Sequence, residues 1–183
     1  TVLDEDVVEV QQLEISQFKG PYLEAISQWN ELLLNVSNIL EFWQKLQKIW
    51  MKLQPIFESS DILKSIPAEA KKFNEANTNW RDLIKILKEN MNVKSVCSRE
   101  GILDKIKTSY STLEQVEKGL NEYTDKKKSI FPRFYFISHE DLIQIISQTK
   151  DLTKINENLK YIFENINDIE FSKDQKTILK MFS

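Results

Sequence analysis

The sequence predicts an all-α fold, an elongated bundle of long helices joined by short connectors. Two observations support this prediction. Apolar residues recur at alternating steps of three and four over several long segments, which is the spacing of one buried helix face. Only three glycines and four prolines interrupt the 183 residues, which is too few for the tight turns of a β architecture. We therefore expect helices of many turns that pack along their length.

The first segment, residues 1–20, is the least regular. It is acidic, and its apolar residues follow no clear period, so a short helix is one reading of it. Gly20-Pro21 breaks the pattern, and Pro21 suits the first turn of the helix that follows. We expect residues 1–20 to form a poorly defined amino-terminal segment, ahead of a long-helix bundle at residues 21–130.

The strongest helical pattern runs from Tyr22 to about Gln54. A helix of this length extends about 50 Å, because each residue adds ~1.5 Å, so the bundle is expected to be rod-like. Pro55 is expected to end or kink the helix, with Ser59-Ser60-Asp61 as a connector. The predicted buried stripe consists of Trp29, Leu32, Val36, Ile39, Trp43, Leu46, Trp50, Leu53 and Phe57.

Two further long helices are predicted before residue 130. One begins at Pro67 and ends between Glu89 and Asn92, and Val93–Cys97 then forms a short connection. The next begins near Ser98 and ends at the basic run Lys126–Lys128, because lysines favour the negative carboxyl end of a helix. Their stripes are Phe73, Ala76, Trp80, Leu83 and Leu87 in the first, and Leu103, Ile106, Tyr110, Leu113, Val116, Leu120 and Tyr123 in the second.

An aromatic stretch separates these helices from the last part of the chain. Pro132 lacks a backbone donor and restricts the residue before it, so the preceding helix should stop by about Ile130. An extended segment would send alternate bulky side chains to opposite faces, and neither face is polar, so we expect a joint buried on both sides. In it the stem of Arg133 lies over aromatic rings and its charge stays at the surface. The predicted structural joint is Phe131, Pro132, Arg133, Phe134, Tyr135 and Phe136.

Residues 131–183 combine this joint with a following helical packet. Ser138 is a plausible N-cap, with Asp141 three residues later. Leu142, Ile145 and Ile146 are expected to be buried in a short helix. Another helix begins at Asp151 or Thr153, and the last dozen residues fit a helix or a strand. The spacing that predicts the longer helix is that of Ile155, Leu159, Ile162, Ile166 and Ile169.

The joint also carries a resemblance to a known family. The run from Phe131 to Ser138 is followed by Glu140-Asp141-Leu142 and Ile145–Gln148, and it resembles the linker region of dynein heavy chains, their N-terminal region 2. The similarity covers most of the chain, from Tyr22 to Ser183, in matching order and spacing. Its other elements are Trp43, Gln47–Trp50, Leu53–Phe57, Ser60–Ile62, Pro67–Glu69, Phe73 and Trp80.

The resemblance implies a mechanical function. In this family the linker is a helical lever that bends and straightens across a ring of AAA+ ATPase modules and so drives movement along microtubules. The implied partners are the ring of the same heavy chain and, indirectly, dynein complex subunits and microtubules, in a cytoplasmic, cytoskeletal setting. Residues 58–67 look closer to ciliary (axonemal) than to cytoplasmic heavy chains. The apolar finish at 178–182 fits a single fragment cut from a longer chain.

The residues alone indicate no catalysis. There is no glycine-rich phosphate loop, and one histidine and one cysteine cannot supply a usual zinc ligand set, so no cofactor and no metal are expected. Cys97 and His139 could form a nucleophile and base, but a partly buried thiol and a surface histidine are the favoured interpretation. Cys97 has no second cysteine for an internal disulfide, which fits a reducing compartment. We expect a non-enzymatic segment.

Two clusters were weighed as binding sites. The tryptophans Trp29, Trp43, Trp50 and Trp80 could form an aromatic cage or a base-stacking surface, but their helical spacing with leucine and isoleucine favours a core stripe. The stripe of Trp43, Leu46 and Trp50 could instead be a groove for a partner. Lys126–Lys128 could contact phosphate or an acidic partner, and a solvated helix end is the favoured interpretation. The net charge of −3 gives no pull toward nucleic acid or an anionic membrane, and no apolar run is long enough to span a bilayer.

Without the resemblance, other classes stay open. A free-standing helical adaptor or spectrin-like scaffold would bind partner helices through the same apolar stripes. A helical hydrolase would need polar groups that converge in a pocket, and the sequence shows none.

Overall fold

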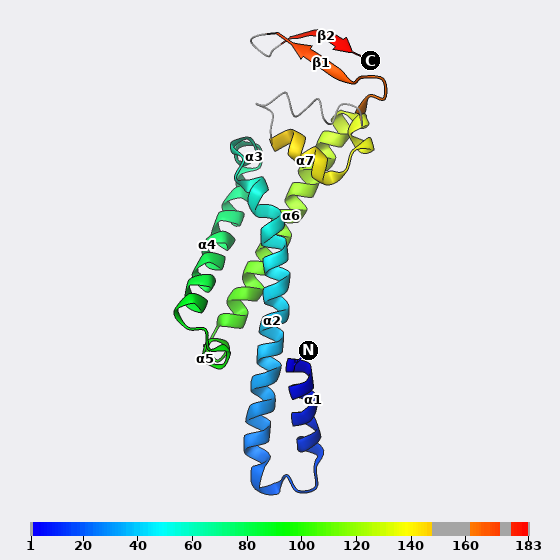
Figure 1. Cartoon of the computed structure of the whole chain (residues 1–183). Coiled ribbons are helices and arrows are strands. Elements are labelled where there is room, and N and C mark those ends of the chain that lie inside the picture. The colour runs from blue at the N-terminus through cyan, green and yellow to red at the C-terminus, as the bar shows by residue number, and fades with distance from the viewer. Residues whose placement is uncertain (1, 148–161, 173–176, 183) are drawn as a thin grey trace. The chain divides into compact units, whose positions relative to one another are not determined.

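The structure, a computed structural model, describes residues 2–147, 162–172 and 177–182 (Figure 1). The all-α, multi-helix fold predicted from the sequence is confirmed, with one small antiparallel sheet added. The α-helices are α1 (Val2–Ile15), α2 (Leu23–Phe57), α3 (Ser60–Ser65), α4 (Pro67–Glu89), α5 (Val93–Cys97), α6 (Ile102–Ile130) and α7 (His139–Ser147); the 3₁₀ helices are η1 (Gly20–Tyr22) and η2 (Pro132–Phe136); the strands are β1 (Asp168–Phe171) and β2 (Ile178–Phe182).

The chain divides into two compact units. Unit 1 comprises Thr1–Trp50 and Glu75–Leu113, and unit 2 comprises Met51–Asn74 and Glu114–Ser183. The division falls within α2, α4 and α6, so each of these helices contributes residues to both cores. We describe each unit by itself.

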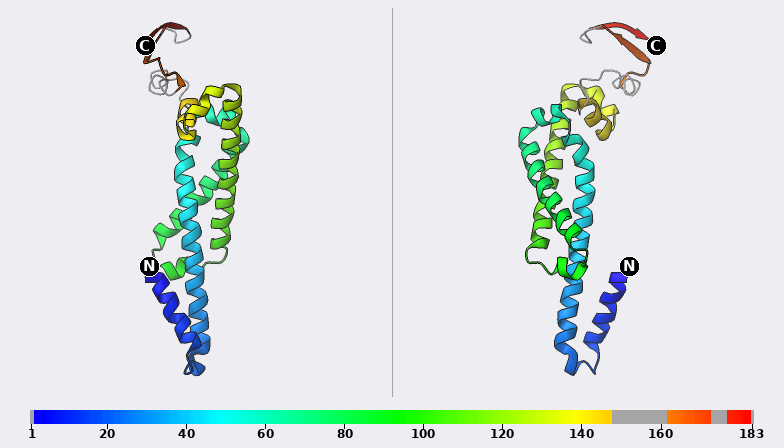
Figure 2. Two further views of the ribbon diagram at one scale, coloured as in Figure 1. Left: turned by 90° about the vertical axis from the view of Figure 1, so that its right-hand side faces the viewer. Right: turned by 60° about the vertical axis from the view of Figure 1, so that its left-hand side comes forward.

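Unit 1 is built on the amino-terminal part of α2. The views of Figures 1 and 2 both place α1 beside the first turns of this helix. Asn30 Nδ2 of α2 donates a hydrogen bond of 3.0 Å to Glu14 Oε2 of α1. Further along α2, Asn35 Nδ2 donates to the Cys97 carbonyl at 3.0 Å and so ties α2 to α5. The buried apolar side chains of the unit are Val10, Leu33, Val36, Ile39, Leu46, Ile49, Ala76, Trp80, Leu83, Val96, Cys97, Ile102, Ile106 and Leu113.

Three tryptophans meet in the core of unit 1. Trp80 of α4 is only 3% exposed, and its ring centroid lies 4.5 Å from that of Trp43 and 5.9 Å from that of Trp50. Trp50 Nε1 donates to Asn77 Oδ1 at 3.0 Å, so its polar end is satisfied while its ring packs. Heptad spacing thus brings α2 and α4 together along one apolar seam.

Trp29 was predicted to be part of the buried core stripe, but it is partly exposed. Its side chain is 45% exposed, and Lys94 Nζ lies over its ring, 5.2 Å from the centroid. Around this residue α2 is flanked by α1, with Val10 and Trp29 lining one open apolar groove. At this end of α2 the buried position is Leu33, one helical turn later.

The connection from α4 to α6 also differs from expectation. Residues Val93–Cys97, predicted as a connector, form the short helix α5, capped where Asn92 Oδ1 accepts from Ser95 N at 3.0 Å. The sequence at Ser98 resembled a helix start, yet α6 begins at Ile102. Gly101, at φ 76°, supplies the left-handed turn between the two helices, a conformation that costs other residues free energy.

Unit 2 contains the other ends of the long helices. The rings of Phe57 in α2 and Phe73 in α4 stack at 4.7 Å between centroids. Pro55 lies inside the last turn of α2, which continues to Phe57, so the helix ends slightly later than predicted. The predicted connector at Ser59–Asp61 instead leads into α3, whose Ile62 is fully buried and which packs on α7. Helix α4 has the bounds predicted for it.

The end of the described chain is a two-stranded antiparallel sheet. Ile169 of β1 pairs with Met181 of β2, and Glu170 pairs with Lys180, whose Nζ lies 3.5 Å from Glu170 Oε2. The strand alternative for the last dozen residues is therefore the observed one. Ile169 had been placed in a helix by its spacing from Ile166, which was wrong, because cross-strand pairing with Met181 decides its conformation.

The helix predicted from Asp151 or Thr153 lies mainly outside the described residues, including Ile155 and Leu159. Its member Ile162 is described and is buried.

The tryptophan cluster gives a direct test of the core of unit 1. Trp80→Ala should lower the free energy of unfolding by about 3–5 kcal/mol, because it removes a buried ring and leaves a cavity. Trp29→Ala is the matched control, and we expect less than ~1 kcal/mol from this exposed side chain. Urea denaturation followed by circular dichroism measures both, and equal losses would contradict the placement of the two rings.

Candidate functional site at the α6–α7 corner

The stretch that the sequence singled out lies in unit 2, between α6 and α7. Helix α6 ends at Ile130, as predicted from Pro132, which occupies the first position of η2. The backbone N–H of Phe134 donates to the Phe131 carbonyl at 3.0 Å and closes the first turn of η2. Ile137, which is extended, and Ser138 then connect η2 to α7, which begins at His139.

The joint is neither extended nor covered on both sides, which corrects the prediction. In a 3₁₀ helix residues three apart lie on the same side, so Phe131 and Phe134 face each other, with ring centroids 4.8 Å apart. Phe134 is half-buried, whereas Tyr135 and Phe136 are 62% and 74% exposed. The assumption of two-residue alternation failed because Pro132 starts a tight helical turn instead of a strand.

Arg133 places its charged guanidinium against an aromatic ring, whereas its stem was predicted to lie there with the charge at the surface. Its guanidinium carbon is 4.8 Å from the centroid of Phe163, and its Nη1 donates to the Ile162 carbonyl at 3.1 Å. The ring of Phe163 also lies 6.4 Å from that of Phe131. A cation on an aromatic face contributes of order 0.5–1 kcal/mol at such a partly exposed position, so Arg133 helps to hold the 162–163 segment against η2.

A small apolar cluster lies beneath the joint. Ile137, Leu142 and Ile162 are buried together, with partly buried apolar side chains packed against them. This cluster fixes η2 and α7 to one another within unit 2. The partly buried members are Phe134, Ile145, Ile146 and Phe163.

The start of α7 is capped by Ser138, as predicted. Its Oγ accepts a hydrogen bond of 3.1 Å from Asp141 N and donates one of 2.6 Å to Asp141 Oδ2. The carboxylate also lies near the positive amino-terminal end of the helix, which is favourable. In α7, Leu142 and Ile143 are the buried residues, and the predicted Ile145 and Ile146 are half-buried.

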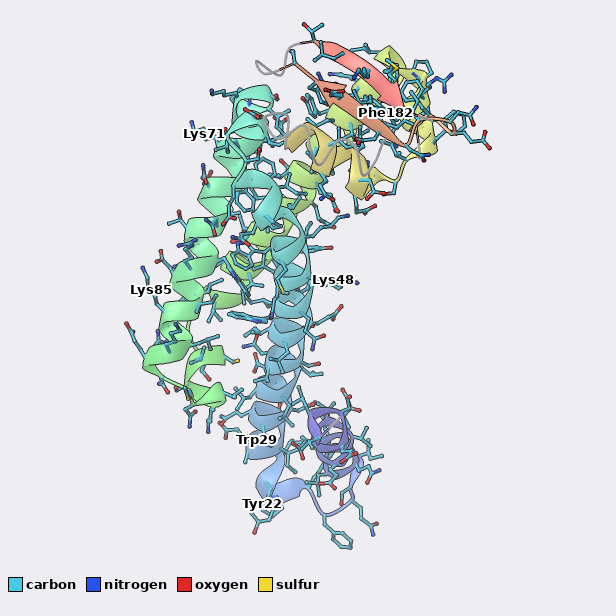
Figure 3. All side chains as sticks on the ribbon, turned by 45° about the horizontal axis from the view of Figure 1, so that its top comes forward. Tyr22, Trp29, Lys48, Lys71, Lys85 and Phe182 are labelled. Atoms are coloured by element: carbon cyan, nitrogen blue, oxygen red, sulfur yellow. The ribbon has the colours of Figure 1, made fainter. Side chains whose placement is uncertain are left out.

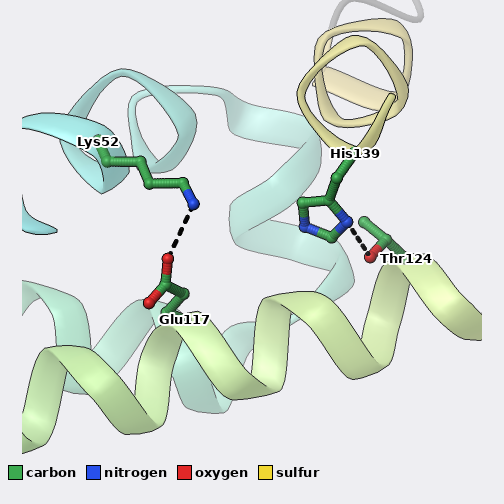
Figure 4. Close-up of polar contacts among 4 residues, drawn as sticks. All are labelled: Lys52, Glu117, Thr124 and His139. Atoms are coloured by element: carbon green, nitrogen blue, oxygen red, sulfur yellow. Dashed lines mark hydrogen bonds and ion pairs between the residues drawn. The ribbon is translucent and has the colours of Figure 1, made fainter. Parts of the chain in front are cut away.

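His139 connects α7 to α6 through a fully buried threonine (Figure 4). Thr124 Oγ1 donates to the Asn121 carbonyl at 2.8 Å and lies 3.2 Å from His139 Nδ1. Because the single hydroxyl proton is engaged with Asn121, the threonine oxygen accepts from His139, so we assign the imidazole proton to Nδ1. His139 Nε2 is then a bare lone pair, and it is buried without a hydrogen-bond partner among the described residues.

The pKa of His139 is shifted down from that of an ordinary histidine. Burial is the largest cause, and the positive charges of Lys128 and Lys52 act in the same direction. Glu140 and Asp125 act in the opposite direction and do not overcome it. His139 is therefore neutral at neutral pH, which fits a buried Nε2.

A second polar contact joins α2 to α6 in the same unit. Lys52 Nζ lies 2.9 Å from Glu117 Oε1, and Figure 4 shows this pair on the side of His139 away from Thr124. The hydrogen bond that Lys52 donates to Glu117 is the main reason that the pKa of Lys52 is raised. Both side chains are partly exposed, so the pair contributes about 1 kcal/mol or less to stability.

Sequence reasoning did not identify the contacts of Thr124 or Lys52. A signal for the first was present, because Thr124 follows Leu120 by four residues on the buried face of α6. The stripe was instead continued to Tyr123, which is only half-buried. The Lys52–Glu117 pair joins residues far apart in sequence, and no local pattern predicts it.

The groups considered for catalysis are engaged elsewhere. Cys97 is a buried free cysteine of unit 1, and burial raises the pKa of its thiol, which lowers the thiolate fraction needed for nucleophilic attack. His139 belongs to unit 2 and bonds to Thr124. Among the described residues no three His, Cys, Asp or Glu side chains gather as metal ligands. In the same part of the chain, no helix has the length and apolar content needed to cross a membrane.

The whole chain matches known proteins. A family profile described as "Dynein heavy chain, N-terminal region 2" covers residues 1–183. The chain belongs to this dynein heavy chain family. Dynein axonemal heavy chain 1 of Mus musculus is 38% identical over 182 residues, 100% of this chain and 4% of the relative. Dynein axonemal heavy chain 12 of Homo sapiens is 35% identical over 170 residues, 93% of this chain and 6% of the relative.

The family placement confirms the resemblance stated from the joint and the tryptophans. A third relative, dynein axonemal heavy chain 3 of Mus musculus, is 35% identical over 171 residues, which is 93% of this chain. These relatives are all axonemal, in agreement with the subtype suggested by residues 58–67. This dynein heavy chain segment spans only about one twentieth of the length of the relatives, 4% of two of them and 6% of the third.

The histidine predicts a pH dependence of stability. A histidine whose pKa is lowered by folding takes up its proton more readily when unfolded, so its contribution is intact above the ordinary value of ~6.5 and declines below it. Acidification from about pH 7.5 to 5.5 should therefore destabilise the chain, and His139→Gln should reduce that dependence. Thermal melting over this pH range measures it, and parallel curves for both proteins would contradict the assignment.

The geometry of the joint predicts that replacing its aromatic residues by alanine lowers the free energy of unfolding by unequal amounts. Phe134→Ala should lower the free energy of unfolding by about 2 kcal/mol, below the ~3–5 of a fully buried ring, because Phe134 is half-buried. Phe136→Ala, at an exposed neighbouring position, is the matched control and should change stability by less than ~0.5 kcal/mol. Urea denaturation of both variants decides, and a larger loss from Phe136 would contradict the geometry.

Proposed function

We propose that this segment is a mechanical linker of a dynein motor, a lever that bends and straightens across an AAA+ ring to produce the power stroke. The observation that carries the proposal is the family match over residues 1–183. In this proposal ATP binding and hydrolysis belong to other parts of the heavy chain, and the segment itself is non-catalytic. Residues 1–20, 21–130 and 131–183 act as parts of one linker fragment.

The helices are suited to transmitting force. Helices α2, α4 and α6 span 35, 23 and 29 residues, and each has buried apolar positions in both units. Bending such a helix must separate packed side chains over several turns, and each lost buried contact opposes the bend. A stiff element without chemistry of its own fits the role of a lever.

Bending is expected where long helices end. Candidate positions are residues 55–67, residues 90–98 and the corner at residues 131–138. The last of these is fastened by the Ile137–Leu142–Ile162 cluster and by the Ser138 cap, so we propose that it locks its neighbours and that compliance lies at the other two.

The proposed partners follow from the motor context. The direct partner is the AAA+ ring of the same heavy chain, and dynein subunits and microtubules are reached through the rest of the motor. The relatives are named axonemal, so we place the protein in the cytoskeleton of a cilium or flagellum. No nucleic acid and no membrane are part of this proposal.

The lever is tested in the intact motor. Leu46→Ala removes a fully buried side chain from α2 and should soften the packing without touching an ATPase site. We expect microtubule gliding to slow several-fold while ATP turnover stays close to that of the unmodified motor. Lys48→Gln, at an exposed position of the same helix, is the control and should change neither rate. Equal loss of both activities, or unchanged gliding, would contradict the lever.

One observation favours the alternative of a helical adaptor. An open apolar groove on unit 1 is lined by side chains of α1, η1 and α2, and such grooves accept amphipathic helices. The same gliding measurement separates the two functions, because in an adaptor a loss of core packing is not expected to change the gliding velocity of the motor. The lining residues are Val10, Leu13, Tyr22, Ala25, Ile26 and Trp29.

A further inference from the structure

The exposed face of the α6–α7 corner is both aromatic and basic. Ile130 is 78% exposed, and Phe131, Tyr135 and Phe136 are also exposed, so four large apolar side chains within seven residues face solvent. Isolated exposed apolar residues are ordinary, but several large ones close together in one short segment are a feature of binding surfaces. We refer to these four side chains, with the four cations described next, as the basic-aromatic corner.

Among the described residues, no carboxylate forms an ion pair with the cations of this corner. From Lys126 to Ser138 the chain carries four cationic and no acidic side chains, in a protein of net charge −3. Lys127 Nζ lies 5.3 Å from the Tyr123 ring and Lys128 Nζ 5.9 Å from the Tyr135 ring. The lysines thus rest on aromatic faces and keep their charge available to a ligand. The cations are Lys126, Lys127, Lys128 and Arg133.

We propose that the basic-aromatic corner binds an acidic peptide segment that also carries aromatic or aliphatic anchors, supplied by another part of the same heavy chain. The acidic side chains of this segment meet the three lysines, and its apolar anchors cover Phe136 and Ile130. The charge of the corner favours an acidic ligand over a basic one, because the corner is positive although the whole chain carries a net negative charge. The proposal rests on the proposed function, since it places the segment within a heavy chain.

The source within one polypeptide follows from length and affinity. The relatives are about twenty times longer than this chain, so most of such a heavy chain lies outside it. A patch of four side chains and a few exposed charges binds weakly between separate molecules, because exposed charge pairs contribute little. Attachment to the same chain raises the effective concentration to the millimolar range, at which weak contacts are occupied.

The first experiment uses a defined probe on the 183-residue chain. The probe is a fluorescein-labelled synthetic peptide of about 12 residues that alternates glutamate with phenylalanine, a length that suits an extended ligand. We expect binding that weakens with salt and is lost when glutamine replaces glutamate or serine replaces phenylalanine. Binding that persists in the glutamine peptide would overturn the electrostatic part, and absence of binding would overturn the proposal.

Variants locate the site. Phe136→Ala, and separately Lys126→Gln with Lys128→Gln, should each weaken peptide binding about tenfold at low salt. The double variant Lys48→Gln, Lys71→Gln is the matched control, because both side chains extend from the ribbon into solvent (Figure 3) and the charge change is equal. Thermal melting confirms that each variant folds. Equal weakening by the control would show attraction by net charge and overturn the site.

The source is tested with peptides copied from the parent heavy chain. Overlapping peptides of about 15 residues, taken outside residues 1–183, should include an acidic-aromatic segment that binds the chain and is lost with Phe136→Ala. Binding of the synthetic probe with no binding by any parental peptide would overturn the shared polypeptide as the source. Preference for anionic phospholipid vesicles over every peptide would overturn the peptide. None of these failures alters the gliding test, so the lever and the corner stand or fall separately.

Discussion

Burial of the apolar seam of α2 is the interaction on which the rest of the structure depends. In unit 1 the seam meets Trp80, and in unit 2 its continuation at Phe57 stacks on Phe73. A seam of this kind does two things at once. It removes large apolar surfaces from water, and within each unit it makes successive turns of α2 part of the same packing, so local bending disturbs many contacts. Stability and stiffness therefore have one origin.

The polar contacts refine this arrangement without driving it. Lys52 and Glu117 are partly exposed, and their attraction is offset by solvent screening. The contact between His139 and Thr124 differs, because Thr124 is fully buried and the loss of a hydrogen-bond partner is costly there. The neutral histidine keeps a buried lone pair, whereas a proton would add a positive charge in a partly buried site that Lys128 and Lys52 already make less favourable for it. Geometry and charge thus act together at the attachment of α7.

Most of the fold could be predicted from the sequence, because helical periodicity is a local property. The bounds of α4, the end of α6 at Ile130 and the Ser138 cap follow from neighbouring residues alone. The errors came from non-local causes. Trp29 shares the helical spacing of the core tryptophans, but whether a side chain is buried depends on which other helices pack against that part of α2. The predicted extended backbone at Phe131–Phe136 was also wrong, because Pro132 is compatible with both an extended segment and a 3₁₀ turn.

The 3₁₀ turn also explains why the corner has both a firmly packed backbone and exposed aromatic side chains. A strand buried on both sides would have used all six residues for packing. The 3₁₀ turn instead divides them: Phe134 points into the cluster with Leu142, while Tyr135 and Phe136 remain on the surface. An exposed aromatic side chain on a firmly held backbone loses little conformational entropy when it binds. A corner that is stiff inside and apolar outside can therefore serve one linker both as a joint and as a docking point.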